Sequence, residues 1–421
     1  MDTTTAAGSW VGIDWGDRSH SVCLLAASGE LLESFTIEHS AEGLDALTTR
    51  LLGHGPVLGV AIETDQHLLV YQLLRAGLPV YPVNPKIAHE WGKCLKVDPP
   101  KSDQRAAWTL ASGLRAFAAH LRPLRPDDPL TRELDLRCGH ECDLIASRTA
   151  FANKLKDTLK RYFPEFLEWF SALTHPTAAD FLLAYPTPQA LRQAPKADLC
   201  RFLRGHRIRI GPRWQALLDG RAGKTPWPSD EAAARAYADY AAGLARQLKA
   251  LNATLAELRE RIEALFAQHP DAALFRSLPS AGPKLAPRLL ASFGSDRERY
   301  PDAGAVQALG GAVPLTRQSG GKKDVLFRWA CRKDFRTTLH LFAFGTLRHS
   351  PWARAYYDRA RGRGQSHALA LRNLAAKWLK IIFRMWQTRT PYHEALYLRS
   401  LREHGSPLAP RLGGAQPGEG Q

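Results

Sequence analysis

Three acidic residues in the first quarter of the chain have the types and the setting of a metal site for phosphodiester chemistry. Asp14 lies inside the apolar segment WVGIDWG, Glu63 ends VLGVAIE, and Asp103 opens a helix-like stretch after PPKS. A carboxylate within an apolar strand is costly unless it binds a cation or finds hydrogen-bond donors. Carboxylates from separate elements suit Mg²⁺, a hard cation that prefers oxygen ligands. We therefore expect these three acids to bind Mg²⁺ and to serve phosphoryl transfer.

A fourth carboxylate would contribute best one helical turn after Asp103, at position 106 or 107. The chain has alanine at both places, Ala106 and Ala107. Each of the three acids alone is an ordinary feature of a strand end or a helix start. Their combination, with Lys101 beside Asp103, is what favours a metal site.

A second candidate for chemistry lies in the basic segment RQSGGKK. Ser319 precedes two glycines, and a serine in a basic loop can attack a phosphate while neighbouring cations stabilise the transition state. No obligate histidine partner is visible, and the same residues also suit an ordinary surface loop. The basic residues near the acids and the serine are predicted to bind nucleic acid, namely Lys101, Arg317, Lys322, Lys323, Arg328 and Arg332.

The overall composition favours a polyanionic partner. Lys and Arg number 57 against 41 Asp and Glu, so the net charge is +16. Such an excess indicates nucleic acid, although a basic protein without this partner is the alternative. The six cysteines form no disulfide framework, and Cys138-Gly-His-Glu-Cys142 lacks a second pair for zinc. No signal pattern and no apolar run of about 18 residues is present, so we expect a soluble intracellular protein without a membrane partner.

Hydrophobic patterning predicts an α/β domain followed by helices. Apolar segments typical of strands alternate with helical patterns in the order β-β-β-α-β-α-β, as in an RNase H-like domain. The expected strands are 10–14, 20–26, 32–38, 58–63 and 79–83, and the expected helices are 41–52 and 66–76. Apolar residues from Tyr237 to Leu265 then recur at steps of three and four. This spacing predicts a coiled coil, within the chain or between protomers, or an ordinary bundle helix.

The chain resembles the DEDD transposases of the insertion-sequence family one-ten, which are bridge-RNA-guided recombinases. The resemblance extends from Val11 to about Trp386. The segments that show the resemblance include VGIDWGDRSHSVCLL, AIETDQHLLVYQLLRAGLPVYPVNP, PPKSDQRAAWTLA, LPSAGPKLAPRLLASFG and YPDAGAVQALGGAVPLTRQSGGKK. It implies a RuvC-like RNase H-fold domain at 1–127, a helical and coiled-coil region with an Arg-rich insert at 128–268, a mostly helical transposase domain at 269–395, and a disordered tail at 396–421.

The resemblance also implies roles for individual residues. Asp14, Glu63 and Asp103 match the first three acids of the family, which bind Mg²⁺, and Ser319 matches a nucleophile that links transiently to DNA. The implied partners are donor and target DNA, a non-coding bridge RNA, and further copies of the chain in a homodimer or homotetramer. The implied location is the bacterial cytoplasm, at the nucleoid.

The chain departs from the family pattern at the fourth acid, where Ala106 stands. Losing a carboxylate weakens metal binding and slows the reaction without unfolding a helix, which alanine suits. The departure leaves three explanations: a decayed copy, an engineered inactive form, or a site rearranged to use Asp17 or Asp65. The rival functions are therefore an active recombinase and a catalytically impaired nucleic-acid-binding relative. A plain junction resolvase would need neither Ser319 nor the long C-terminal part.

Overall fold

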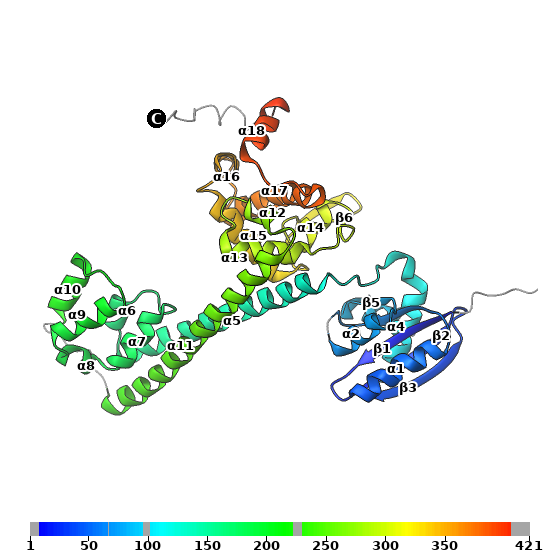
Figure 1. The fold of residues 1–421 in the computed structure, drawn as a ribbon, viewed down its shortest axis with the longest axis horizontal. Coiled ribbons are helices and arrows are strands. Elements are labelled where there is room, and N and C mark those ends of the chain that lie inside the picture. The colour runs from blue at the N-terminus through cyan, green and yellow to red at the C-terminus, as the bar shows by residue number, and fades with distance from the viewer. Residues whose placement is uncertain (1–7, 66, 96–101, 222–229, 406–421) are drawn as a thin grey trace, which may run out of the picture. The chain divides into compact units, whose positions relative to one another are not determined.

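The computed structural model describes residues 8–65, 67–95, 102–221 and 230–405. Its internal contacts divide the chain into two units, Met1–Pro126 and Asp127–Gln421 (Figure 1). No helix among the described residues is long and apolar enough to cross a membrane.

The first unit is built on a five-stranded mixed sheet with the strand order β3-β2-β1-β4-β5. β2 pairs antiparallel with both β1 and β3, whereas β1, β4 and β5 run parallel. Parallel neighbours need crossover connections, and helices supply them. The strands are β1 (Ser9–Trp15), β2 (Ser19–Ala26), β3 (Leu31–Glu38), β4 (Val57–Ile62) and β5 (Val80–Pro82), and the first two helices are α1 (Ala41–Gly53) and α2 (Leu68–Arg75).

Helices cover both faces of this sheet because β1, β2 and β4 alternate apolar side chains between the two faces. Val11 and Ile13 of β1 pack with α1 and α2 on one face. On the opposite face, Ala61 of β4 packs with two later helices, α3 (Pro85–Leu95) and α4 (Asp103–Phe117). A short 3₁₀ turn, η1 (Ala118–His120), follows α4.

The predicted elements of the first unit agree with the structure in type and order. Every expected strand is present, with ends that differ by at most one residue. The expected helix over 66–76 begins later, at Leu68, and the expected helix over 41–52 extends to Gly53. A Ser40 cap explains the sharp start of α1, since its side chain accepts a hydrogen bond from the Gly43 N–H at 3.0 Å.

The second unit is organised by two long helices, α5 (Pro129–Tyr162) and α11 (Glu231–Gln268). They run antiparallel, because the start of α5 and the end of α11 share one core while the end of α5 and the start of α11 share another (Figure 1). The first of these cores includes Leu134 and Phe266, and the second includes Leu159 and Leu244.

The second core belongs to a helical insert between α5 and α11. Its aromatic centre includes Phe166, Trp169 and Phe181, which are almost fully buried. The expected Arg-rich insert is largely helical up to residue 221, where this described range ends. The helices of the insert are α6 (Phe166–Trp169), α7 (Pro176–Ala184), α8 (Pro188–Gln193), α9 (Lys196–Gly205) and α10 (Pro212–Gly220).

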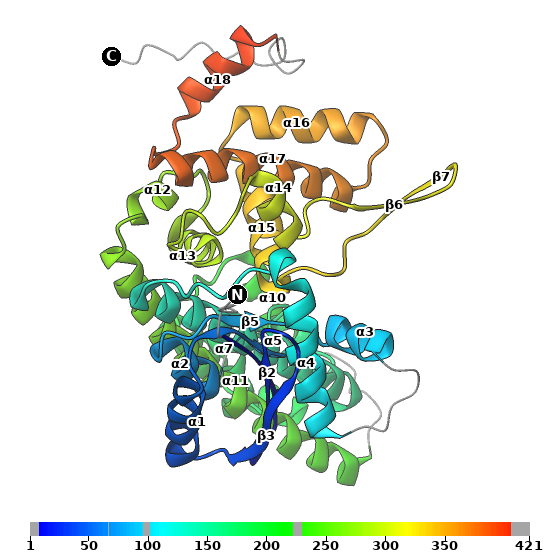
Figure 2. The ribbon, with the colours of Figure 1, turned by 90° about the vertical axis from the view of Figure 1, so that its right-hand side faces the viewer.

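The first core belongs to the C-terminal helices and one β-hairpin, which projects from them (Figure 2). Trp352, Trp378 and Trp386 are fully buried there, so the tryptophans of the basic C-terminal stretch fill a core. The elements are α12 (Ala272–Arg276), α13 (Gly282–Phe293), α14 (Ala303–Leu309), β6 (Leu315–Ser319), β7 (Lys322–Leu326), α15 (Lys333–Thr346), α16 (Pro351–Gly362), α17 (His367–Thr388) and α18 (Glu394–Glu403).

The structure decides between the alternatives for one expectation of the second unit and corrects another. The stripe from Tyr237 to Leu265 packs within the chain, because residues such as Leu244, Leu248 and Ile262 are buried in its own two cores. The disordered tail expected from residue 396 begins inside α18, where Leu401 is buried and Tyr397 packs on Trp352 with ring centroids 4.9 Å apart. Residues 406–421 lie outside the described part of the chain.

A buried ion pair network ties α5 and α11 to α13. Glu141 of α5 has a side chain only 2% exposed and accepts hydrogen bonds from Arg259 at 2.6 Å and from Arg288 at 2.6 Å. The Glu141 carboxylate raises the pKa of Arg288, although burial opposes that shift. A guanidinium left alone in this place would be a buried, uncompensated charge.

Glu141→Gln is therefore expected to lower the free energy of unfolding of the second unit by about 3–5 kcal/mol. Denaturant titration followed by circular dichroism would measure the change. Asp358→Asn is the matched control, because the Arg354–Asp358 pair is exposed to solvent and should contribute little to stability. Equal effects of the two variants would show that Glu141 is not essential to the core.

Candidate active site

The first carboxylate, Asp14, lies near the end of the central strand β1 on the face covered by α4. Gly12 shares this face, and a Cβ at Gly12 would lie only 2.0 Å from the Ala107 carbonyl oxygen and 2.4 Å from the Ala111 nitrogen. Glycine is therefore required for α4 to approach β1 so closely. This close approach places the start of α4 beside the end of β1 that carries Asp14.

The second carboxylate, Glu63, follows the neighbouring parallel strand directly. The register pairs Gly12 with Ala61 and Ile13 with Ile62, so one further step along both chains reaches Asp14 and Glu63. Because side chains alternate between faces, Glu63 follows Ala61 toward the α4 face just as Asp14 follows Gly12. Both carboxylates are partly buried, and they come from the carboxyl ends of adjacent strands.

The third carboxylate, Asp103, is the first residue of α4. Ser102 caps this helix, since its hydroxyl accepts a hydrogen bond from the Arg105 N–H at 3.2 Å. The cap fixes where the helix begins and leaves Asp103 exposed in its first turn. An acid there also interacts favourably with the helix dipole.

The electrostatics connect these three carboxylates. Burial, and then the negative charges of Asp103 and Glu63, raise the pKa of Asp14 to about 6. Burial also raises the pKa of Glu63. Negative charges near one another at the ends of two strands and the start of a helix favour either a shared proton or a bound cation. The arrangement therefore has the electrostatic character of a cation site.

The donor set fits Mg²⁺ in kind. All three side chains offer carboxylate oxygens, and Mg²⁺ in proteins is often held by one or two carboxylates together with water and substrate phosphates. Within the described ranges, no three His, Cys, Asp or Glu side chains are grouped closely enough to hold a metal ion. A Mg²⁺ ion held by these acids would take its remaining ligands from water and substrate phosphate.

The two candidate positions for a fourth acid differ in how deeply α4 buries them. Ala107 is fully buried against Cys23 and Leu25, so a carboxylate there would enter an apolar core. Ala106 is partly exposed and lies one turn after Asp103. Position 106 is thus the only one of the two that suits an acid.

The two substitute acids considered from the sequence lie in loops. Asp17 is exposed after β1, and Asp65 is exposed in a bend after β4. Because β4 ends at Ile62, Asp65 does not lie on a strand that continues past Glu63.

A group of histidines beside Asp14 was missed in the sequence. The Gly16 N–H donates to His20 Nδ1 at 3.2 Å, which leaves His20 Nε2 to donate to His39 Nδ1 at 2.9 Å. Burial, and then His39 and His67, lower the pKa of His20. His67 has a backbone φ of 133° and stacks on Trp15 with ring centroids 4.3 Å apart. These contacts hold the loop that follows Asp14 in place. No sequence motif predicts them.

The raised pKa of Asp14 predicts that the first unit becomes less stable to unfolding as the pH rises. An acid whose pKa rises from 3.8 to about 6 on folding contributes stability at low pH that is lost as the pH rises through this range. Without divalent cations, Asp14→Asn should therefore melt at a higher temperature than the native chain at pH 7.5, and the two should converge at pH 4. Thermal unfolding in chelator measures this, with exposed Asp17→Asn as control. A difference that does not change with pH would contradict the electrostatic explanation.

Ser319 belongs to the second unit and lies at the turn of the β6–β7 hairpin (Figure 2). It pairs with Lys322, and Gly320 between them has a φ of 56°, which suits glycine in a two-residue turn. Every residue of β6 is exposed. The hydroxyl of Ser319 has no hydrogen-bond partner within the part of the chain that the structure describes.

The predicted cations fall into three groups. Arg317 and Lys322 share the face of the hairpin that carries Ser319, whereas Lys323 lies on the opposite face. Arg328 donates to the Val313 carbonyl oxygen at 3.3 Å, and Arg332 pairs with Asp135 and Asp334. Arg332 thus anchors α15 to α5. The remaining predicted cation, Lys101, lies outside the described residues.

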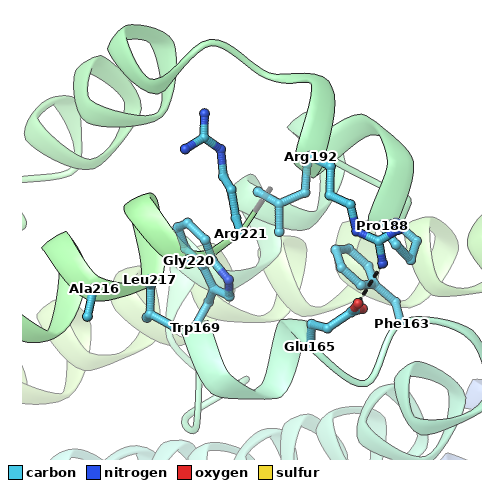
Figure 3. Close-up of a pocket in the computed structure, with 10 residues that line it drawn as sticks. Phe163, Glu165, Trp169, Pro188, Arg192, Ala216, Leu217, Gly220 and Arg221 are labelled. Atoms are coloured by element: carbon cyan, nitrogen blue, oxygen red, sulfur yellow. Dashed lines mark hydrogen bonds and ion pairs between the residues drawn. The ribbon is translucent and has the colours of Figure 1, made fainter. Parts of the chain in front are cut away.

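The pocket of the helical insert brings none of these residues together. It encloses about 50 Å³ and is lined by residues such as Phe163, Trp169 and Leu217 (Figure 3). Arg192 pairs with Glu165 at its edge with 2.7 Å between the charged atoms. Its size suits a water molecule, not a nucleotide.

Comparison with known proteins gives the same family over both units. A family model described as "Transposase", of the DEDD type, matches residues 11–164, and a model described as "Transposase IS116/IS110/IS902 family" matches residues 272–358. A Streptomyces coelicolor protein named as a mini-circle transposase for IS117 is 32% identical to this chain, over 91% of this chain and 95% of its own length. The insertion element IS900 42 kDa protein of Mycobacterium paratuberculosis is 27% identical over 92% of this chain and 97% of its own. The chain therefore belongs to the IS116/IS110/IS902 family of transposases.

Proposed function

We propose that this chain cuts and rejoins DNA strands in a Mg²⁺-dependent reaction with Ser319 as nucleophile and with Asp14, Glu63 and Asp103 as the metal-binding acids. The observation that carries the proposal is the placement of Asp14 and Glu63 at the carboxyl ends of two paired parallel strands. Burial, and then the charges of Asp103 and Glu63, raise the pKa of Asp14, which supports a cation at this place. The strand order of the first unit also fits an RNase H-like fold of the RuvC type.

In this mechanism the Ser319 oxygen attacks phosphorus, and the phosphodiester bond to the deoxyribose oxygen breaks. The serine hydroxyl gives its proton to solvent water, and the departing oxygen takes one from solvent water. Mg²⁺, when bound, supplies positive charge to the scissile phosphate. Arg317 and Lys322 lie on the same hairpin face and stabilise the extra negative charge of the transition state. Attack by a hydroxyl of the other strand then releases Ser319.

The basic surface of the second unit supports nucleic acid as partner. An open groove of about 720 Å³ between α14 and α17 is lined by Lys380 and Arg384 beside Phe383. Cations beside an aromatic ring suit a strand backbone with its bases. We assign donor and target DNA to this surface and to the hairpin. A non-coding bridge RNA as guide, and a homodimer or homotetramer as the active assembly, follow from the family resemblance.

A second candidate function is nucleic-acid binding with impaired catalysis. The observation that favours it is Ala106, which occupies the one position in α4 suited to a fourth acid. Such a chain would keep its fold and its basic surfaces and would lose most of its cleavage rate.

The test is a strand-cleavage assay on element-end DNA with Mg²⁺ and the RNA encoded beside the gene. An active recombinase gives a covalent protein–DNA adduct that depends on Mg²⁺. Binding of DNA without any adduct would support the impaired relative.

A further inference from the structure

The segment that follows the β6–β7 hairpin exposes an aromatic pair. Trp329 is 76% exposed, the highest value among the large apolar side chains that the structure describes. Its ring meets that of the half-buried Phe327 edge to face, with centroids 4.7 Å apart. Trp329 therefore presents a ring to solvent on a support of fixed geometry, as a stacking surface requires.

Two guanidinium groups from different helices lie against the same Phe327. Arg336 of α15 is 4.6 Å from the ring centroid and Arg372 of α17 is 4.5 Å from it. Arg336 donates one hydrogen bond to the Arg328 carbonyl oxygen. Within the described residues neither guanidinium pairs with a carboxylate, and the Nε of each is buried without a hydrogen-bond partner.

These cations are electrostatically uncompensated. Burial, and then the charge of Arg336, lower the pKa of Arg372, and both arginines add to burial in lowering the pKa of His340. Arg332, four residues before Arg336, has two carboxylate partners instead. Two guanidiniums on the same ring, without an acid among the described residues, provide the charge that a phosphate group requires.

We propose that Trp329, Arg336 and Arg372 hold one unpaired nucleotide of the DNA strand that Ser319 attacks, with the base on Trp329 and its phosphate on the two arginines. This inference rests on the proposed function. A stacking ring needs an open base face, which an unpaired nucleotide offers and a duplex does not. Lys322–Leu326 spans only about 14 Å, so the nucleotide lies a few positions from the scissile phosphate.

Anisotropy titrations of the full chain with end-labelled single-stranded and duplex DNA test the proposal. Trp329→Ala should weaken single-strand binding about tenfold or more and leave duplex binding nearly unchanged. Arg372→Gln should reduce the slope of log K against log salt concentration by about one. Exposed Tyr240 and Arg246 of α11 provide the controls, Tyr240→Ala and Arg246→Gln, which should change neither quantity.

The proposal is overturned if Trp329→Ala and Arg372→Gln bind single-stranded DNA like the native chain while their melting temperatures are unchanged. A larger loss for single-stranded RNA of the same length would overturn the assignment to DNA. The adduct assay distinguishes a failure of the proposed reaction from a failure of this nucleotide site. A native chain that gives no serine adduct but loses strand binding with Trp329→Ala keeps this site and rejects the proposed reaction. An adduct together with unaltered strand binding rejects this site alone.

Discussion

Replacing Ser319 with alanine is expected to abolish the covalent protein–DNA adduct and to slow strand exchange by at least about 10³-fold. The substitution removes only the hydroxyl group, and Ser319 is exposed at the hairpin turn. The variant should therefore fold and bind DNA like the native chain. Adduct formation is measured by the shift of radiolabelled DNA on a denaturing gel.

Gln318→Ala is the matched control for this prediction. Gln318 is the preceding residue of the same exposed strand, and its side chain points to the opposite face of the hairpin. It should reduce the adduct by no more than a few-fold. An adduct that persists in Ser319→Ala would assign the nucleophile to another residue of the chain.

Ala106→Asp is expected to raise the cleavage rate tenfold or more at limiting Mg²⁺ and to lower the Mg²⁺ concentration needed for half-maximal rate. A carboxylate at this position adds an oxygen donor one turn from Asp103, on a partly exposed site of α4. Lost metal-site partners commonly cost 10–100-fold in affinity or activity, about the size of the gain expected here. Initial rates across a Mg²⁺ titration measure the effect.

Ala107→Asp is the control for this gain. Ala107 is fully buried with Cys23 and Ala111, so an acid there should destabilise the first unit and lower the rate. An unchanged rate in Ala106→Asp would mean that three acids and the substrate already satisfy the metal.

The strands that position the site were predictable from sequence because they are short apolar runs, which the structure buries on both faces of the sheet. Side chains alternate along a strand, so Val11 and Ile13 face one core while Gly12 and Asp14 face α4. The ending of β4 next to Glu63 was likewise visible, since the apolar run stops there. The sequence could therefore place Asp14 inside one strand, Glu63 at the end of another and Asp103 at the start of a helix.

Other parts of the site could not be read from the chain, because they depend on contacts between distant segments. The His20–His39 contact joins residues 19 positions apart, and the Arg332–Asp135 pair joins residues 197 positions apart. The sequence does not show whether a basic residue has a carboxylate partner in the folded chain. Arg332 was therefore predicted to bind nucleic acid, and Arg336 was not among the predicted residues. The apolar stripe of α11 likewise predicted a partner helix without identifying α5.

The antiparallel pair α5 and α11 has a consequence for how such chains can diversify. α11 has 38 residues and is therefore about 57 Å long, and each of its ends is built into a different core. Adding or removing about seven residues in both helices would keep the apolar stripe in phase and alter only the distance between the cores. The pair thus acts as an adjustable spacer. Relatives can change their reach in steps of roughly 10 Å without redesigning either end.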